Sequence, residues 1–180
     1  MKTRGIITVV SLIALVSLAS WVFLSIAGTK RAPDVTFKTI DGRQLDLQSL
    51  RGKPVLVTFW ATTCTGCMKE MPHLIALYRD LSPRLEIIGV AMAYDPPSQV
   101  VKLTELIQVP YPISLDIDGK IANAFGNVML TPTSFLISPD GKIIKYMVGE
   151  MDMDKLHTRI VDLLAKDKLA FSKSPANNNS

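Results

Sequence analysis

Residues 54–72 read PVLVTFWATTCTGCMKEMP and join a run of β-branched and aromatic residues to both cysteines of the chain. The run that ends at Trp60 predicts a strand that is buried on both faces of a sheet. From Cys67 to Leu81, apolar residues recur at spacings of four and three, which predicts a helix with one apolar stripe. Cys64 and Cys67 therefore fall at the turn from a central strand into the helix that follows it.

The other segments predict the rest of one α/β domain. Residues 35–47 predict a hairpin around the turn pair Asp41-Gly42. After the cysteine helix come a strand, a helix, a short strand, a short helix, an antiparallel strand pair and a closing helix. In that order, these segments cover residues 85–93, 98–107, 113–115, 119–125, 134–137 with 142–148, and 156–164. A parallel strand-helix-strand unit followed by an antiparallel pair predicts a mixed sheet covered by helices on both faces.

The N-terminal segment, residues 5–29, contains no charged residue. As a helix, residues 6–27 would span roughly 33 Å, which is enough for the hydrocarbon core of a bilayer. We favour a retained anchor over a cleaved signal peptide, whose apolar region is usually about 7 to 15 residues long. Pairs of small residues two positions apart, Ser17 with Ala19 and Ser25 with Ala27, leave cleavage as the alternative. The predicted anchor crosses the inner (cytoplasmic) membrane once, with the domain facing the periplasm or the cell exterior.

The 180-residue chain therefore divides into three predicted parts. Residues 1–29 are the membrane anchor, residues 30–170 the folded domain, and residues 171–180 a tail of Ser, Pro and Asn character that we expect to be disordered. The formal net charge of +4 includes Lys2 and Arg4 before the anchor. The remaining positive excess is small and scattered, so nucleic acid is not an expected partner.

Two structural roles for the cysteine pair, a stabilising disulfide and a zinc site, have little support in the sequence. A structural disulfide between Cys64 and Cys67 would close a very short loop and would constrain little of the unfolded chain. A zinc site needs four ligands, and the only other soft ligands in the chain are His73 and His157. We therefore predict no metal site.

The redox interpretation has a mechanism in the local geometry. If the helix begins near Cys64, the unpaired backbone N–H groups and the positive end of the helix dipole stabilise a thiolate on that residue. Cys67 lies one turn further into the helix, and it can attack the mixed disulfide that Cys64 forms with a partner.

The sequence resembles the thioredoxin superfamily and, within it, the TlpA-like and ResA-like membrane-anchored thiol-disulfide oxidoreductases. The resemblance covers residues 31–168 and rests on LRGKPVLVTFWATTCTGCMKEMP (50–72) and TPTSFLISPDGKI (131–143). It implies a thioredoxin-like α/β fold, in which helices flank a mixed central sheet, with an N-terminal hairpin and a transmembrane anchor helix. It also implies that the Cys64–Cys67 disulfide is the redox group and that no separate cofactor is needed.

The resemblance assigns roles to individual residues. It implies that Cys64 is the exposed attacking cysteine and Cys67 the resolving one. Pro132 matches a cis-proline that faces the pair, although an ordinary trans proline at a strand start is the alternative. The implied substrate-binding residues are Thr131, which would offer its backbone to a client strand, and Trp60, Thr65 and Gly66. The family often has tryptophan and proline where this chain has Thr63 and Thr65, which leaves the redox potential and the docking surface open.

Asp95 is the last candidate that the resemblance suggests. ResA-like proteins have an acidic residue near the active site, just after the strand that precedes the inserted helix, and Asp95 occupies that place in AMAYDPPS. A base near Cys67 would help it to form the attacking thiolate. The alternative is that an aspartate before two prolines belongs to a turn.

The implied activity is the transfer of electrons to client proteins with disulfides or thiols, as in cytochrome c maturation or copper-centre assembly. A membrane thiol protein would supply the electrons.

Three alternative functions are distinguished by their sequence motifs. Peroxiredoxins have threonine where this chain has Ala61, and copper carriers of the Sco type use CxxxC rather than CxxC. Oxidases of the Dsb type insert a helical domain, and isomerases of that type add a dimerisation domain. In this chain the insert between the strands is short by comparison. The sequence leaves the direction of electron flow open.

Overall fold

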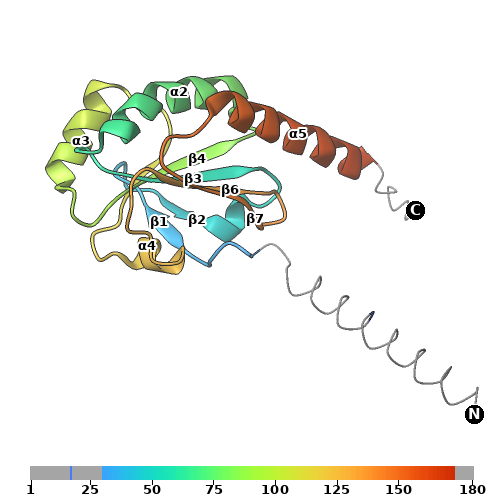
Figure 1. Ribbon diagram of the computed structural model, residues 1–180, viewed down its shortest axis with the longest axis horizontal. Helices are drawn as coiled ribbons and strands as arrows, with labels where there is room; N and C mark the ends of the chain where they lie inside the picture. The colour runs from blue at the N-terminus through green and yellow to red at the C-terminus, as the bar shows by residue number, and fades with distance from the viewer. Residues whose placement is uncertain (1–16, 18–29, 173–180) are drawn as a thin grey trace, which may run out of the picture. The chain divides into compact units, whose positions relative to one another are not determined.

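A five-stranded mixed sheet lies at the centre of the structure, with the strand order β5-β4-β3-β6-β7 (Figure 1). β3 pairs in parallel with β4 and antiparallel with β6. β5 extends the parallel side and β7 the antiparallel side. The strands are β3 (Val55–Trp60), β4 (Glu86–Ala91), β5 (Ile113–Leu115), β6 (Thr133–Ile137) and β7 (Ile143–Val148). The predicted mixed sheet is confirmed.

This computed structural model describes residues 17 and 30–172, and residues 31–172 belong to one compact unit. Apart from Ser17, the expected anchor at residues 1–29 lies outside the described residues, as does the expected tail beyond residue 172. Within the described part of the chain, no helix combines the length and the hydropathy that crossing a membrane requires. The closing helix α5 (Met153–Ser172) runs two residues into the segment that we expected to be disordered.

β3 is buried along its whole length because elements cover both faces of the sheet. Alternate strand residues point to opposite faces, so Leu56 and Trp60 face one side while Val57 and Phe59 face the other. On the first side, Leu56 and Trp60 pack in one core with residues of three helices. These helices are α2 (Thr65–Leu81), α3 (Pro97–Leu106) and α5, which lie together above the sheet in Figure 1.

The second face of the sheet differs from the prediction that helices cover both sides. Its main cover is the predicted hairpin, β1 (Thr36–Lys38) and β2 (Gln44–Asp46), with the 3-10 helix η1 (Leu47–Leu50). Within the described part of the chain, α4 (Lys120–Ala124) is the only α-helix that contributes to this core, and it is short. Phe37 of β1 is fully buried there. The extended chain before β3 therefore covers this face of the sheet, where we expected a helix.

Candidate active site

The two cysteines form a disulfide at the beginning of α2, with their Cα atoms 5.2 Å apart. Cys64 is the N-cap residue, and its sulfur accepts a hydrogen bond from the backbone N–H of Cys67 at 3.2 Å. Cys64 is half-buried, whereas Cys67 is only 3% exposed. The helix start is where we predicted it, and Cys64 is the sulfur that a partner protein can reach.

The loop in front of the cysteines is held by Asp95, which follows the end of β4. The Oδ2 atom of Asp95 accepts from the backbone N–H of Thr62, and Oδ1 accepts from the Thr62 hydroxyl, both at 2.6 Å. Asp95 is buried, and it is not among the residues that line the cavity behind Cys67. The structure therefore brings Asp95 to the active-site loop, and its role as a base stays a prediction.

The loop that contains Pro132 lies against the cysteine loop. The Thr131–Pro132 peptide bond is cis, as we predicted. A Cβ atom at Gly66 would lie 3.4 Å from Cδ of Pro132, which is ordinary van der Waals contact, so the two loops lie against each other at this point. Thr131 is half-buried, and its hydroxyl lies 3.3 Å from the Tyr94 hydroxyl. Three predicted site residues, Pro132, Thr131 and Gly66, are thus brought together beside the disulfide.

Behind the disulfide is a small cavity of about 10 Å³. Trp60 lines it and is 2% exposed, so this residue supports the site from beneath rather than facing a client. Thr65, by contrast, is exposed next to the disulfide. The lining residues are Thr58, Trp60, Cys67, Glu70, Met71, Leu74, Tyr111 and Pro132.

Glu70 is a candidate functional residue that we did not predict. It is 4% exposed, and its Oε1 atom accepts a hydrogen bond from the backbone N–H of Met151. Burial raises the pKa of the Glu70 carboxyl above its ordinary value, while the Met151 N–H opposes the rise. The sequence could have indicated this burial. Residues three apart share a helix face, so Glu70 lies on the buried side of α2 with Cys67. A charged residue on an apolar stripe indicates a buried carboxyl.

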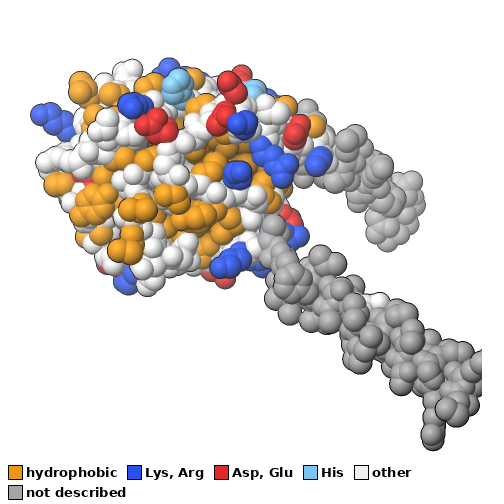
Figure 2. Space-filling view, in the orientation of Figure 1, with side chains coloured by type: hydrophobic (Ala, Val, Ile, Leu, Met, Phe, Trp, Pro, Cys, Tyr) orange, Lys and Arg blue, Asp and Glu red, His pale blue; other side chains and the backbone are white. Residues whose placement is uncertain are grey.

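Three apolar residues are exposed next to the loop that contains Thr131 and Pro132. Tyr94, Met129 and Leu130 are 60%, 74% and 64% exposed. Met129 and Leu130 directly precede Thr131, and Tyr94 reaches the same residue through its hydroxyl. Figure 2 shows hydrophobic side chains gathered on one face of the domain, with charged side chains mainly around them. An exposed apolar surface of this kind is typical of a protein-binding site.

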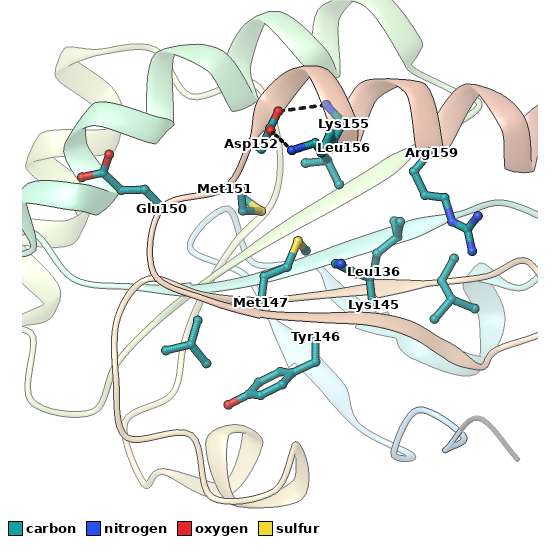
Figure 3. Close-up of a pocket in the computed structure, with 12 residues that line it drawn as sticks. Leu136, Lys145, Tyr146, Met147, Glu150, Met151, Asp152, Lys155, Leu156 and Arg159 are labelled. Carbon is teal, nitrogen blue, oxygen red and sulfur yellow. Dashed lines mark hydrogen bonds and ion pairs between the residues drawn. The ribbon is translucent and has the colours of Figure 1, made fainter. Parts of the chain in front are cut away.

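A larger hollow of about 690 Å³ lies between β7 and α5 (Figure 3). Its walls include Met147 of β7 and Leu156 of α5, with Glu150 and Met151 from the connection between these elements. Glu150 forms an exposed ion pair with Lys69 of α2 at 3.3 Å. The hollow contains no cysteine among its lining residues. The β7–α5 connection, which forms part of the wall of the hollow, also donates the backbone N–H of Met151 to Glu70.

The described residues contain no group of three or more His, Cys, Asp or Glu side chains that could hold a metal ion. His73 is exposed on α2, and His157 is exposed on α5, where its Nε2 atom lies 3.4 Å from Asp80.

Known proteins resemble this chain in sequence and in structure. The family model described as AhpC/TSA matches residues 29–146. The thiol-disulfide oxidoreductase ResA of Bacillus thuringiensis subsp. konkukian is 35% identical over 128 residues, which cover 71% of this chain and 73% of ResA.

Two solved structures share the fold. A thiol:disulfide interchange protein of the thioredoxin family from Chlorobium tepidum superposes with a TM-score of 0.70 at 25% identity, over 77% of this chain and 98% of its own. StoA from Bacillus subtilis superposes with a TM-score of 0.61 at 26% identity, over 71% of this chain and 96% of StoA. The thioredoxin-like fold is thus confirmed.

Proposed function

The chain belongs to the AhpC/TSA family and is a thiol-disulfide oxidoreductase of the ResA type, and from this premise we propose that it reduces disulfides of client proteins outside the cytoplasm. The observation that carries the proposal is the unequal burial of the two sulfurs at the start of α2. An accessible sulfur on Cys64 meets the client, and a buried sulfur on Cys67 completes the exchange without being intercepted by other thiols.

The first step is attack by the reduced Cys64 thiolate on one sulfur of the client disulfide. The client S–S bond breaks, its other cysteine leaves as a thiolate, and a mixed disulfide joins Cys64 to the client. The backbone N–H of Cys67 points at the Cys64 sulfur, and the N-terminus of α2 adds its positive dipole. Both features favour negative charge on Cys64.

The second step releases the client. The thiol proton of Cys67 passes to a base, for which the buried Glu70 carboxyl in the same cavity is suited. The Cys67 thiolate then attacks Cys64, forms the Cys64–Cys67 disulfide and expels the client sulfur. The enzyme loses two electrons, and the client gains two thiols. Re-reduction of the enzyme requires a second thiol protein, which we place in the membrane.

Client recognition uses the surface around the disulfide. The apolar residues Tyr94, Met129 and Leu130 are exposed beside Thr131 and supply apolar contacts, and Thr131 offers its backbone to an extended client segment. Thr65 and Gly66, next to the attacking sulfur, complete the contact. This surface fits client disulfides that are flanked by apolar residues in exposed or partly unfolded chain.

The location is the outer side of the cytoplasmic membrane, with residues 1–29 as a single-pass anchor. This location is supported by the N-terminal segment, which has no charged residue from 5 to 29 and is long enough to span a bilayer as a helix. Cytochrome c maturation and copper-centre assembly are the proposed settings, because both need cysteines kept reduced outside the cytoplasm. The name shared by the ResA relatives favours this activity over the peroxidase and copper-carrier alternatives.

The test is the reduction potential of the Cys64–Cys67 couple in the full-length protein, held in detergent and equilibrated with thiol-disulfide buffers. A value near about −270 mV agrees with a reductant, whereas a value near about −120 mV would make the protein an oxidant and overturn the proposal. A copper titration on the reduced protein is the accompanying control, and we expect no tight binding.

A further inference from the structure

The β7–α5 connection contacts the active site at two consecutive residues. The backbone N–H of Gly149 donates a hydrogen bond to the carbonyl oxygen of Pro132 at 2.8 Å. The side chain of Glu150 lies against Gly66, because a Cβ atom at Gly66 would be 3.3 Å from Cγ and 3.4 Å from Oε1 of Glu150. This connection is therefore a third loop of the site, beside the loops that carry the cysteines and Pro132.

The contact with Gly66 places a carboxylate beside the redox pair. Gly66 lies between the two cysteines in the sequence, and the Glu150 side chain rests on it. A side chain at residue 66 would press on Glu150, so the glycine leaves the room that the carboxyl group occupies. In Figure 3, Glu150 points away from the other residues that line the hollow between β7 and α5. Its side chain is 55% exposed, so a docked client can reach it.

The partner of Glu150 within the domain is Lys69 of α2, whose Nζ atom lies 3.3 Å from Oε1. This distance is longer than the roughly 2.7–2.9 Å of a good charge-assisted hydrogen bond. Both side chains are exposed, and an exposed ion pair contributes little to stability. Among the described residues, no group donates a hydrogen bond to the Oε2 atom of Glu150. The carboxylate is therefore held loosely by Lys69 and keeps one oxygen for another donor.

The charges at the cysteine loop favour a basic client segment over an acidic one. Besides Glu150, the contacts of this loop include the carboxylate of Asp95, which bonds Thr62. Charges of opposite sign attract at contact distance with little screening by salt, and charges of like sign repel. An arginine that approaches Gly66 can donate two parallel hydrogen bonds to one carboxylate, whereas Lys69 donates one. A guanidinium can thus displace Lys69 from Glu150.

We propose that Glu150 is a specificity-determining residue of the docking surface, which binds a basic side chain, above all arginine, next to the reactive cysteine of the client. A client with an acidic residue at the same place is disfavoured, because its carboxylate meets that of Glu150. The inference rests on the proposed function, to which it adds the class of client that the site prefers. The bonds that break and form at Cys64 are unchanged.

The experiment compares two peptides that have the same apolar sequence around one cysteine and carry either Arg or Glu on both sides of it. Each cysteine is joined by a disulfide to nitrothiobenzoate, so attack by Cys64 on the peptide sulfur releases a coloured thiolate. Reduced full-length protein in detergent is mixed with each peptide, and the ratio of the two second-order rate constants is measured. The ratio is taken on one protein, so a change in the reactivity of the Cys64 thiolate cancels.

We expect the wild-type protein to react faster with the Arg peptide. Glu150→Gln should lower the Arg-to-Glu ratio about fivefold at low salt, which is the effect of one exposed charge on an attractive and a repulsive contact. Raising the salt to about 0.5 M should shrink this difference. Lys69→Gln should raise the ratio, because the carboxylate loses its competitor. Asp162→Asn is the matched control, since it removes the same charge from an exposed position of α5.

The outcomes separate this inference from the proposed function. An Arg-to-Glu ratio that is the same in the wild type and in Glu150→Gln overturns the inference. A ratio that Asp162→Asn lowers as much as Glu150→Gln assigns the preference to the net charge of the domain and overturns it too. If the wild-type protein released no coloured thiolate from either peptide, the proposed function would fail instead.

Discussion

Asp95 holds Thr62 with both of its carboxylate oxygens, one on the backbone N–H and one on the hydroxyl, each at 2.6 Å. The two residues lie 33 positions apart in the sequence. The contact joins the end of β4 to the loop that carries Cys64, and it is buried from solvent at the aspartate. Asp95 therefore positions the loop, and its action on the proton of Cys67 is a separate question that can be measured.

The first prediction concerns Asp95→Asn. An amide has one acceptor oxygen, so it can accept from the Thr62 N–H only if the Thr62 hydroxyl becomes the acceptor of its NH₂ group, and both hydrogen bonds lose the charge of the carboxylate. We expect the fold to persist with a loss of about 1–2 kcal/mol in the free energy of unfolding, measured by urea denaturation. Asp162→Asn on the exposed part of α5 is the control and should change little.

The same variant tests Asp95 as a base. If it assists Cys67, Asp95→Asn slows the resolving step and alters the pH dependence of client reduction. A rate profile identical to that of the wild type between about pH 5 and 9 would leave Asp95 as a loop residue only.

The second prediction concerns the rate in Glu70→Gln. The glutamine oxygen can keep the hydrogen bond from Met151, but the side chain can no longer accept a proton from Cys67. We expect resolution by Cys67 to slow by about 10²-fold, whereas the first attack by Cys64 is unchanged. Rapid-mixing kinetics separate the two steps. Glu105→Gln, at an exposed position of α3, serves as the control.

The third prediction concerns pH and stability. The pKa of Glu70 in the folded protein is raised above its ordinary value of 4.5, so the folded state keeps this proton where the unfolded chain has lost it. The contribution of Glu70 to stability is therefore complete below the unfolded pKa and is lost as pH rises through the folded pKa. Denaturation at a series of pH values should show this fall in the wild type relative to Glu70→Gln. Parallel curves for the two proteins would contradict it.

The fourth prediction assigns the two sulfurs. In Cys67→Ser, the mixed disulfide between Cys64 and a client cannot be resolved, so it should accumulate and be visible by non-reducing electrophoresis. Cys64→Ser should trap nothing, because the remaining cysteine, Cys67, is only 3% exposed in the structure. Faster alkylation of Cys67 than of Cys64 at neutral pH, measured on the reduced protein, would reverse the assignment.

The fifth prediction concerns the N-terminal segment. Full-length protein should stay in the membrane fraction through a high-salt wash, because apolar contact with lipid does not depend on salt. A phosphatase fused after Lys30 should be active outside the cytoplasm. A mature protein that begins at Ser20 or Gly28, detected by N-terminal sequencing, would replace the anchor with a cleaved signal peptide.

The sequence by itself determined the elements that depend on local patterns. The continuous apolar run before Trp60 specified a strand buried on both faces, and the spacing of apolar residues after Cys67 specified α2. Gly42 has a positive φ of 84°, which a glycine adopts without strain, so the Asp41-Gly42 turn could be located from two letters. These signals act over a few residues, and the order of the elements then restricts the fold to a mixed sheet.

Only the tertiary structure decided which distant residues meet at the site. Glu70 is buried because the backbone of Met151, 81 positions away, packs against α2 and supplies its hydrogen bond. Trp60 and Tyr111 share one cavity because β4, with Gly89, lies between their segments. The cover of the second sheet face by the β1–β2 hairpin was likewise decided by packing. Such contacts depend on strand order, register and the space left between side chains, which no local pattern encodes.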